Sequence, residues 1–316
     1  MPIIKFMAGE AARLGLRLYA VGGCVRDWIM GRPVHDIDFL SGGPADGLAE
    51  AVIARYGGKW QKFVSFQTVR CLTEKAGRID IARFRRETYS KPAALPETVP
   101  ADTVEQDLLR RDFTANAMAA ELAAGDNAGA AFYAALTDIC GGEADIRAGI
   151  IRVLHKDSFR DDPTRIYRAV RFAARFGWQL APETQELAMQ AARAGLPGLL
   201  SRERLRNELA KMLADDNPAA ALEMSAQLGA ADFIFPGLNA MAADFQSILS
   251  PECLPELPGT PVPGINPGEM PVLIRIAAMA RSLVPAGADF IASLRLSKKQ
   301  SRAIAAMAGI TLPRKH

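Results

Sequence analysis

Two aspartates separated by one residue, Asp36 and Asp38, are the first candidates for chemistry in this sequence. They flank Ile37 in a short apolar run that predicts a strand, and alternate residues of a strand point to the same face. Two carboxylates on one face supply the hard oxygen ligands that Mg²⁺ prefers. The motif is common, however, and by itself it fits an exposed polar strand better than a metal site.

A glycine pair, Gly22-Gly23, lies upstream of these aspartates, between a predicted strand and a predicted short helix. Glycine lets the backbone approach a ligand closely, and a helix N-terminus offers free N–H groups to phosphate. Arg26, in the first turn, adds a guanidinium that suits phosphate oxygens. A metal-bound triphosphate needs these parts together, whereas we interpret Asp27 as a structural pairing or capping residue.

Asp80 is a third candidate carboxylate. In the strand predicted around it, Ile79 and Ile81 face the core and Asp80 faces the other way. If this strand lies beside the strand of Asp38, the acids converge and a base there accepts the proton of an attacking hydroxyl. A solvated strand residue explains the pattern equally well.

A polar run follows at Arg111, Asp112 and Asn116. Arg111 can reach phosphate or ribose, Asp112 can accept hydrogen bonds from ribose hydroxyls, and Asn116 can orient the loop or the sugar through its amide. Taken alone, such a run is typical of the solvated start of a helix.

Asp162 precedes a predicted helix that begins at Pro163, a residue suited to a first helical turn. At ~100° per residue, four arginines share about one third of the helix circumference: Arg165, Arg168, Arg171 and Arg175. Asp162 and Arg165 together can present acceptors and donors to the Watson–Crick edge of a base. A solvated helix face would interleave acids with the arginines, but none occurs between Asp162 and Glu183, which favours a polyanionic partner.

Composition limits the class of protein to which these motifs belong. The 316 residues carry 38 Lys plus Arg and 35 Asp plus Glu, a net charge of +3, so any basic surface must be local. With 49% hydrophobic residues, global disorder and coiled coil are poor descriptions. Four separated cysteines with no CxxC pair predict neither a zinc site nor disulfides and fit a reduced, cytoplasmic compartment. No secretory signal or membrane helix is predicted.

The elements that must position the motifs fall into two halves. In the first, we predict strands at 16–21, 35–40, 66–73 and 78–84, helices at 25–30, 45–55 and 106–122, and a loop at 87–103. In the second, we predict helices at 163–176, 182–193, 201–213, 218–228, 271–283 and 297–308, with a proline-rich connection at 251–271. The sequence thus predicts an α/β domain followed by an α-helical half.

These motifs in this order resemble the class II tRNA nucleotidyltransferase and bacterial poly(A) polymerase family of the DNA polymerase beta superfamily. The resemblance covers about residues 15 to 215 and rests on four segments: Gly22 to Asp27 with Gly31 and Asp36-Ile37-Asp38; Arg111 to Ala117; Asp161 to Arg165; and Glu203 to Leu209. Ala115 stands where isoleucine is usual in the family, and Asp161 where glutamate is frequent.

The resemblance implies an α+β nucleotidyltransferase head with a mixed β-sheet over residues 1–150, followed by an all-α half. That half comprises a neck with a nucleotide-template motif over 151–215 and an RNA-binding body with a short tail over 216–316. It also implies a reaction in which the 3′-hydroxyl of a tRNA attacks the α-phosphate of CTP or ATP, at a two-metal Mg²⁺ site, and releases pyrophosphate.

Roles for individual residues follow from the same resemblance. Asp36 and Asp38 would hold Mg²⁺ and act in catalysis with Asp80. The nucleotide would be bound by Gly22, Gly23, Arg26, Arg111, Asp112, Asn116, Asp162, Arg165, Arg168 and Arg171. Within that set, Asp162 and Arg165 would pair with the incoming base as a protein template. Arg168 and Arg171 would support that pair and the phosphates.

Other functions stay open on the sequence alone. A poly(A) polymerase uses the same head, and addition of the full CCA end, of A only or of CC only is not separated. A non-catalytic RNA-binding protein conflicts with the joint presence of the motif residues, and a nuclease or phosphohydrolase usually needs more clustered ligands. No protein partner is evident. The part after residue 215 is short for the family, and its candidate phosphate contacts are Arg202, Arg204, Arg206, Lys211, Lys298, Lys299 and Arg302.

Overall fold

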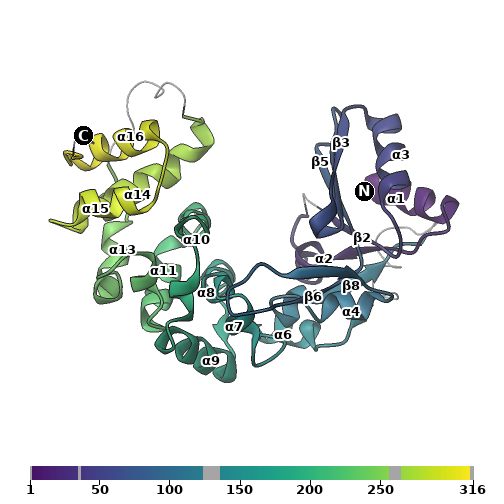
Figure 1. Ribbon diagram of the computed structural model, residues 1–316, viewed down its shortest axis with the longest axis horizontal. Coiled ribbons are helices and arrows are strands. Elements are labelled where there is room, and N and C mark those ends of the chain that lie inside the picture. Colours follow the sequence, from purple (N-terminus) through teal and green to yellow (C-terminus); the bar gives the residue numbers. More distant parts are fainter. Residues whose placement is uncertain (1, 35–36, 124–135, 256–264, 314–316) are drawn as a thin grey trace. The chain divides into compact units, whose positions relative to one another are not determined.

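The structure is a computed structural model that describes residues 2–34, 37–123, 136–255 and 265–313. The chain divides into two compact units, Met1–Ser158 and Phe159–His316. In Figure 1 the first unit is coloured purple through teal, and the second green through yellow.

A seven-stranded mixed sheet is the framework of the first unit, with strand order β3-β4-β5-β2-β1-β8-β9. Strands β2 and β5 run parallel, and the other neighbours are antiparallel. The strands are β1 (Leu18–Val21), β2 (Asp38–Ser41), β3 (Lys59–Phe63), β4 (Thr68–Leu72), β5 (Arg78–Arg83), β8 (Met118–Glu121) and β9 (Leu136–Asp138). This arrangement confirms the predicted mixed sheet.

The other elements of the first unit surround this sheet. They are α1 (Pro2–Arg13), α2 (Gly23–Ile29), α3 (Asp46–Tyr56), α4 (Val104–Leu108), α6 (Gly142–Ala148), the short helices η1 (Val64–Phe66) and η2 (Thr114–Asn116), the hairpin β6 (Arg85–Thr88) with β7 (Glu97–Pro100), and β10 (Ile150–Ile151). Helix α7 (Ser158–Asp161) lies where the two units meet in sequence.

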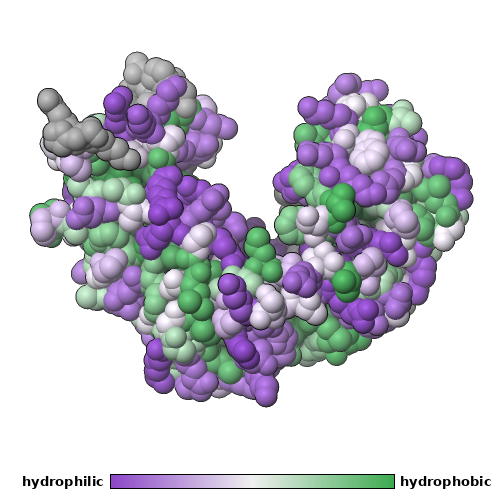
Figure 2. Space-filling view, in the orientation of Figure 1, coloured by the Kyte–Doolittle hydropathy of each residue, from purple (hydrophilic) through white to green (hydrophobic). Residues whose placement is uncertain are grey.

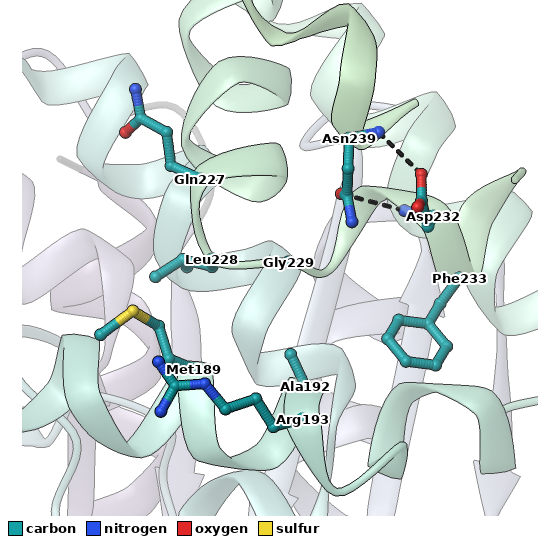
Figure 3. A pocket seen from close by; sticks show the side chains of 9 residues that line it. All are labelled: Met189, Ala192, Arg193, Gln227, Leu228, Gly229, Asp232, Phe233 and Asn239. Carbon is teal, nitrogen blue, oxygen red and sulfur yellow. Dashed lines mark hydrogen bonds between the residues drawn. The ribbon is translucent and has the colours of Figure 1, made fainter. Parts of the chain in front are cut away.

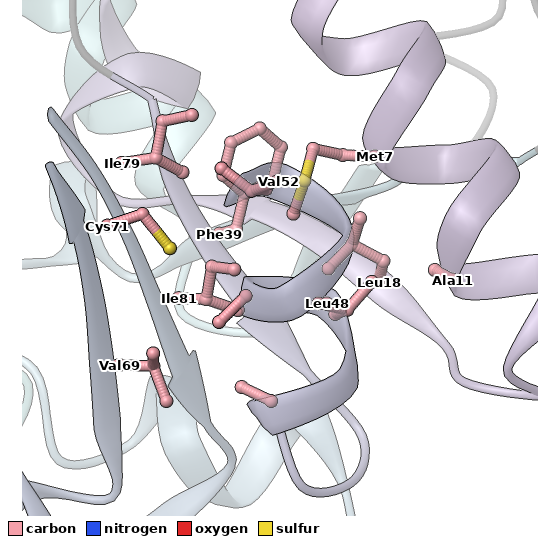
Figure 4. Close-up of a cluster of buried hydrophobic side chains, with 12 residues drawn as sticks. Met7, Ala11, Leu18, Phe39, Leu48, Val52, Val69, Cys71, Ile79 and Ile81 are labelled. Carbon is pink, nitrogen blue, oxygen red and sulfur yellow. The ribbon is translucent and has the colours of Figure 1, made fainter. Parts of the chain in front are cut away.

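One face of the sheet is buried under α1 and α3. Met7 of α1 and Val52 of α3 pack with Val69 and Ile81 of the sheet, all with at most 2% of their surface exposed (Figure 4). Full burial of such a side chain stabilises the fold by about 1.5–3 kcal/mol. Because strand residues alternate between faces, Asp80 beside Ile81 must point to the opposite face.

That opposite face is covered over the central strands only in part. A second buried cluster joins Tyr19, Leu40 and Ala119 of the sheet to Val104 and Leu108 of α4. Within the described residues, the cluster includes no side chain of β3 or β4. On this face, the part of the sheet formed by β3 and β4 therefore lies outside the second buried cluster.

The prediction of one helix over residues 106–122 is wrong. The segment divides into the end of α4, the 3-10 helix η2 and the strand β8. The Asp112 carboxylate accepts the N–H of Phe113 at 2.9 Å, and Phe113 forms a β-bridge with Val153. Both interactions compete with helical hydrogen bonds. The alanine-rich run that suggested a helix is instead buried between β1 and β9, where strand pairing outweighs propensity.

The predicted loop over residues 87–103 contains a strand as well. Strand β7 pairs antiparallel with β6, with Arg86 opposite Val99 and Glu87 opposite Thr98. Pro100, which has no N–H to donate, is the last residue of the strand, where a proline is tolerated. The strand β3 was also not predicted, because its two large apolar residues, Trp60 and Phe63, are three positions apart and do not alternate with its polar residues.

The second unit is built from helices, as predicted for this half. They are α8 (Thr164–Phe176), α9 (Pro182–Arg193), α10 (Arg202–Ala214), α11 (Pro218–Gln227), α12 (Ala231–Ile234), α13 (Phe245–Ile248), α14 (Met270–Ser282), α15 (Gly287–Ser293) and α16 (Lys298–Ala308). The minor elements are β11 (Gln179–Leu180), η3 (Leu196–Leu199), η4 (Asn239–Asp244) and η5 (Pro267–Glu269). Ser201 and Asn217 cap α10 and α11, and Ser297 forms a capping box with Gln300 at α16.

The surface and the cysteines agree with the composition. Polar side chains dominate the face drawn in Figure 2, and hydrophobic ones occur there in small groups between them. None of the helices in the described ranges is long and apolar enough to cross a membrane. All four cysteines, Cys24, Cys71, Cys140 and Cys253, are free thiols in the structure.

Candidate nucleotide-binding and catalytic site

Two of the three predicted catalytic carboxylates lie side by side on the sheet. Asp38 begins β2 and is exposed, and the register of the parallel pair places its Cα opposite that of Asp80 on β5. Side chains directly opposite each other on neighbouring strands share a face. The third residue, Asp36, lies outside the described residues, so the structure describes one member of the predicted Asp36/Asp38 pair.

Asp80 is held by two arginines. Arg70 on β4 donates from Nε to Oδ1 at 2.9 Å and from its terminal nitrogen to Oδ2 at 3.1 Å, and Arg78 donates from Nε to Oδ2 at 3.0 Å. Burial acts to raise the pKa of Asp80, but the hydrogen bonds from Arg70 and Arg78 outweigh it and hold that pKa below its ordinary value. Asp80 is therefore a carboxylate at neutral pH. Arg70 was not predicted from the sequence, because strand pairing alone brings it to the acid.

The glycine pair forms the turn between β1 and α2. Gly22 has φ 73° and ψ −128°, a conformation that residues with a Cβ rarely adopt. A Cβ at Gly22 would lie 2.9 Å from a terminal nitrogen of Arg111, and one at Gly23 would lie 3.5 Å from Arg26. Both predicted arginines therefore pack against the glycine backbone.

A chain of hydrogen bonds joins three predicted nucleotide-binding residues. The buried guanidinium of Arg26 donates to Oδ1 of Asn116 at 2.7 Å, and the amide of Asn116 donates to Oδ1 of Asp112 at 3.1 Å. Arg26 also pairs with Asp27 at 2.8 Å, in the structural role predicted for that aspartate. The first unit thus brings Gly22, Gly23, Arg26, Arg111, Asp112 and Asn116 into one neighbourhood beside β2.

Arg111 is held in place by Asp107, a residue that was not predicted from the sequence. The fully buried carboxylate of Asp107 accepts hydrogen bonds from Arg111 at 3.0 Å and from Arg110 at 2.9 and 3.1 Å. Burial acts to raise the pKa of Asp107, but Arg111 and Arg110 hold it below its ordinary value. The spacing of three and four residues from Asp107 to these arginines was a usable signal, because such residues are neighbours on a helix.

Replacing Asp107 with asparagine is expected to lower the free energy of unfolding by about 2 kcal/mol. Arg111 loses its buried counter-charge and Arg110 loses one of two, the other being Glu87, while the shape is kept. The carboxylate's pKa is depressed in the folded state, so its contribution is complete above about pH 4 and is lost as pH falls through the folded value. Urea unfolding from pH 3 to 7 measures both effects. Asp102→Asn, at an exposed position just before α4, is the matched control. Equal unfolding curves for the two variants would contradict this role.

In the second unit, Asp162 stands at the start of α8 with three hydrogen-bond donors. They are the backbone N–H of Thr164 at 3.0 Å, the hydroxyl of Thr164 at 2.6 Å and the guanidinium of Arg204 at 2.7 Å. Arg204, on α10, was a candidate for phosphate contact. The structure pairs it with Asp162, so we interpret it as a residue that positions this carboxylate.

The predicted basic face of α8 is not uniformly exposed. Arg165 has 5% of its surface exposed, whereas Arg175 is exposed. Arg168 and Arg171 lie over the ring of Phe172, at 5.5 and 4.7 Å from its centroid. Arg171 also pairs with Asp215 at 3.5 Å. These contacts fix the directions of the Arg168 and Arg171 guanidiniums. Helical periodicity alone predicted that the arginines share a face, but not that some of them are buried or paired.

A cavity of about 350 Å³ lies in the second unit, between α9 and the residues around α12 (Figure 3). Its wall includes Met189, Phe233, Asp232 and Asn239. Asn239 N–H donates to Asp232 Oδ1 at 2.7 Å, and Asp232 N–H donates to Asn239 Oδ1 at 3.2 Å. None of its described lining residues was predicted to act in catalysis or nucleotide binding, so this cavity is separate from the candidate site.

Two family models match the chain. The Poly A polymerase head domain matches residues 18–152, and the probable RNA and SrmB-binding site of polymerase A matches residues 178–241. The first match contains the candidate residues of the first unit. The second lies within the helical unit and contains the cavity of Figure 3.

Curated relatives are similar to most of this chain. An A-adding tRNA nucleotidyltransferase of Aquifex aeolicus is 41% identical over 209 residues, 66% of this chain and 24% of the relative. One from Halalkalibacterium halodurans is 36% identical over 70% of this chain and 51% of its own length. A multifunctional CCA protein of Neisseria gonorrhoeae is 37% identical over 72% of this chain and 51% of its own length. The chain thus spans about a quarter to a half of the length of these relatives.

Solved structures match over nearly the whole chain. A tRNA-processing enzyme in an apo form is 31% identical, with a TM-score of 0.71 over 97% of this chain and 77% of its own. A tRNA nucleotidyltransferase complexed with a primer tRNA and an incoming ATP analog is 29% identical. The match has a TM-score of 0.72 and covers 95% of this chain and 83% of that structure's chain. With both family models and this fold, the chain belongs to the class II tRNA nucleotidyltransferase and bacterial poly(A) polymerase family.

Proposed function

We propose that this protein transfers AMP, CMP or both from ATP and CTP to the 3′ end of tRNA, in the cytoplasm. The observation that carries the proposal is the in-register pair Asp38 and Asp80, bordered on one side by Gly22, Arg26 and Arg111. Carboxylates for metal ions, a glycine turn and guanidiniums for a triphosphate are the parts that nucleotidyl transfer needs. The names of the relatives from Aquifex aeolicus and Neisseria gonorrhoeae support tRNA as the acceptor.

The donor set at the edge of β2 fits Mg²⁺. Asp38 is exposed, Asp80 lies beside it as a carboxylate, and both offer only oxygen atoms. No three metal-binding side chains cluster among the described residues, which exclude Asp36. We propose that Asp36 and Asp38 hold the ions, which neutralise charge on the phosphates when bound.

The side chains divide the remaining work. Gly22, Gly23 and Arg26 bind the triphosphate, and Arg111 and Asp112 bind the ribose. The 3′-hydroxyl oxygen forms a bond to the α-phosphorus while the bond to the bridging oxygen breaks and pyrophosphate leaves. Asp80 accepts the hydroxyl proton and passes it to solvent.

Asp162 and Arg165 select the base in this proposal, and Arg204 holds Asp162 in place. Arg204→Met is expected to raise KM for ATP and to reduce discrimination between ATP and GTP, each by about tenfold, because one charge-assisted hydrogen bond to Asp162 is lost. Steady-state kinetics with each nucleotide measures the change. Arg206→Met, on the same helix, is the control, since Arg206 donates to the carbonyl of Arg295 instead. Unchanged discrimination in Arg204→Met would contradict this role for the pair.

Incorporation on three tRNA transcripts tests the proposed function. The transcripts end before CCA, after one C and after CC, and each receives CTP, ATP or both, with Mg²⁺. Completion of CCA on all three identifies a full CCA-adding enzyme, and one A on the CC-ended transcript alone identifies an A-adding enzyme. Long A tails would identify a poly(A) polymerase. No incorporation on any transcript would refute the proposal and leave RNA binding without catalysis.

A further inference from the structure

The row of register-paired residues that contains Asp38 and Asp80 continues across two more strands. Arg70 on β4 is opposite Asp80, and Gln61 on β3 is opposite Arg70. Residues two positions along a strand share a face, so Lys59 and Arg78 also belong to this side, one row away. We call Lys59, Gln61, Arg70 and Arg78 the outer strip.

The outer strip faces away from the hydrophobic core. Figure 4 shows the intervening residues Val69, Cys71, Ile79 and Ile81 on the side of α3. Lys59 and Gln61 are exposed, and the side chains of Arg70 and Arg78 are 36% and 56% exposed. The strip therefore offers three cations and an amide to solvent, directly beside the catalytic carboxylates.

The order of strands gives this strip a direction. The glycine turn, Arg26 and Arg111 all lie on the β1 side of Asp38, whereas β5, β4 and β3 lie on the other side. In phosphoryl transfer, the attacking and leaving oxygens are roughly in line. If the pyrophosphate leaves toward Arg26, the attacking 3′-hydroxyl arrives from the side of Asp80, and the RNA strand that carries it lies over β4 and β3.

We propose that the outer strip binds the last phosphates of the RNA strand that is extended. This inference rests on the proposed function and adds the surface that holds the RNA 3′ end. Arg70 suits the role because Phe63 lies under its guanidinium at 5.2 Å and two of its N–H donors bond Asp80, which fixes its plane. Its remaining donors suit phosphate oxygens. The alternation of cations with an amide and an aromatic ring favours a single-stranded nucleic acid over a protein partner.

The test uses variants that separate RNA binding from chemistry. Lys59→Gln/Arg78→Gln removes two cations of the strip, and Arg70→Gln removes the third. Lys62→Gln is the matched control, because Lys62 lies on the same strand, points to the other face and pairs with Asp46 at 2.8 Å. Affinity for a CC-ended tRNA transcript is measured by fluorescence anisotropy in EDTA at several salt concentrations. The same measurement is repeated on a transcript whose single-stranded 3′ end has been removed.

For Lys59→Gln/Arg78→Gln we expect Kd for the CC-ended transcript to rise about tenfold. The slope of log Kd against log salt concentration should fall by about 1.4, which is about 0.7 for each of the two lost phosphate contacts. The trimmed transcript should bind wild type and variant equally. KM for the RNA should rise with KM for ATP unchanged. Arg70→Gln should raise the same Kd. In both variants kcat should also fall, because Asp80 loses one of its two arginine partners in each.

Unchanged Kd, salt slope and RNA KM in the double variant would overturn the inference while leaving the proposed function intact, provided that wild type extends the transcript. An equal loss of affinity for the trimmed transcript would also overturn it, because the strip would then contact another part of the RNA. A fall in kcat alone in Arg70→Gln would reduce Arg70 to a positioning residue for Asp80. Absence of incorporation by wild type would overturn the proposed function, and this inference with it.

Discussion

Replacing Asp38 with asparagine is expected to lower the single-turnover rate of nucleotide addition by about a thousandfold or more. The change removes one negative charge at the point where charge develops on the transferred phosphate, and interactions of this kind carry much of the catalytic effect in enzymes. Asp38 is exposed at the start of β2 and its neighbour Phe39 is buried, so the strand keeps its anchor in the core. Folding and RNA affinity should therefore stay near wild type.

The measurement pairs rapid-quench incorporation on a CC-ended transcript with urea unfolding and with RNA binding in EDTA. Glu50→Gln, an exposed carboxylate on α3 beyond the other face of the sheet, controls for loss of charge alone. A rate within about threefold of wild type for Asp38→Asn would exclude Asp38 as a metal ligand. Loss of RNA binding or of stability along with the rate would show that Asp38 has a structural role instead.

Much of the site followed from the sequence because its residues are local. The segment from Gly22 to Arg26 and the alternation that points Asp80 away from the core both depend on neighbours in sequence, and the structure shows both. Arg70 could not be found in this way. Its position beside Asp80 depends on the pairing of β4 with β5, which a single sequence does not specify.

The errors have a common physical cause. Residues 106–122 contain strong helix formers, and intrinsic propensity favours one long helix. The structure instead ends α4 at Leu108 and buries Met118 in a strand, because pairing with β1 and β9 satisfies the backbone inside the core. Asp107 lies in α4 near its end and pairs with Arg111, which follows just after the helix. The functional residues thus depend on an element that local propensity misjudged.

Hydrogen bonds between a charged group and a side-chain partner recur among the candidate site residues. Asp107 holds Arg111, Asn116 holds Arg26, and Arg204 holds Asp162. A guanidinium that is already fixed by a partner loses less conformational entropy when a phosphate or ribose arrives. We infer that these second partners matter to nucleotide affinity as much as the residues that touch the nucleotide.

Gly22→Ala tests whether the fixed position of Arg111 beside the glycine turn matters for nucleotide binding. Gly22 adopts φ 73° and ψ −128°, and an added Cβ would lie 2.9 Å from the Arg111 guanidinium. Alanine therefore imposes backbone strain of about 1–3 kcal/mol and also displaces Arg111. Since a displacement of about 1 Å at a positioning residue costs roughly 100-fold, kcat/KM for ATP should fall by about 100-fold.

Gly15→Ala separates strain from displacement. Gly15 also has a positive φ, 66°, but a Cβ there meets no atom within 4 Å. We expect Gly15→Ala to lose stability in urea and to keep kcat/KM for ATP within about threefold of wild type, because Arg111 is not displaced. Gly22→Ala should lose both stability in urea and kcat/KM for ATP. Isothermal titration with a non-hydrolysable ATP analogue should show weaker binding in Gly22→Ala and unchanged binding in Gly15→Ala. Equal kinetics for the two variants would mean that the glycine turn serves folding only, and that Arg111 does not need its backing to bind the nucleotide.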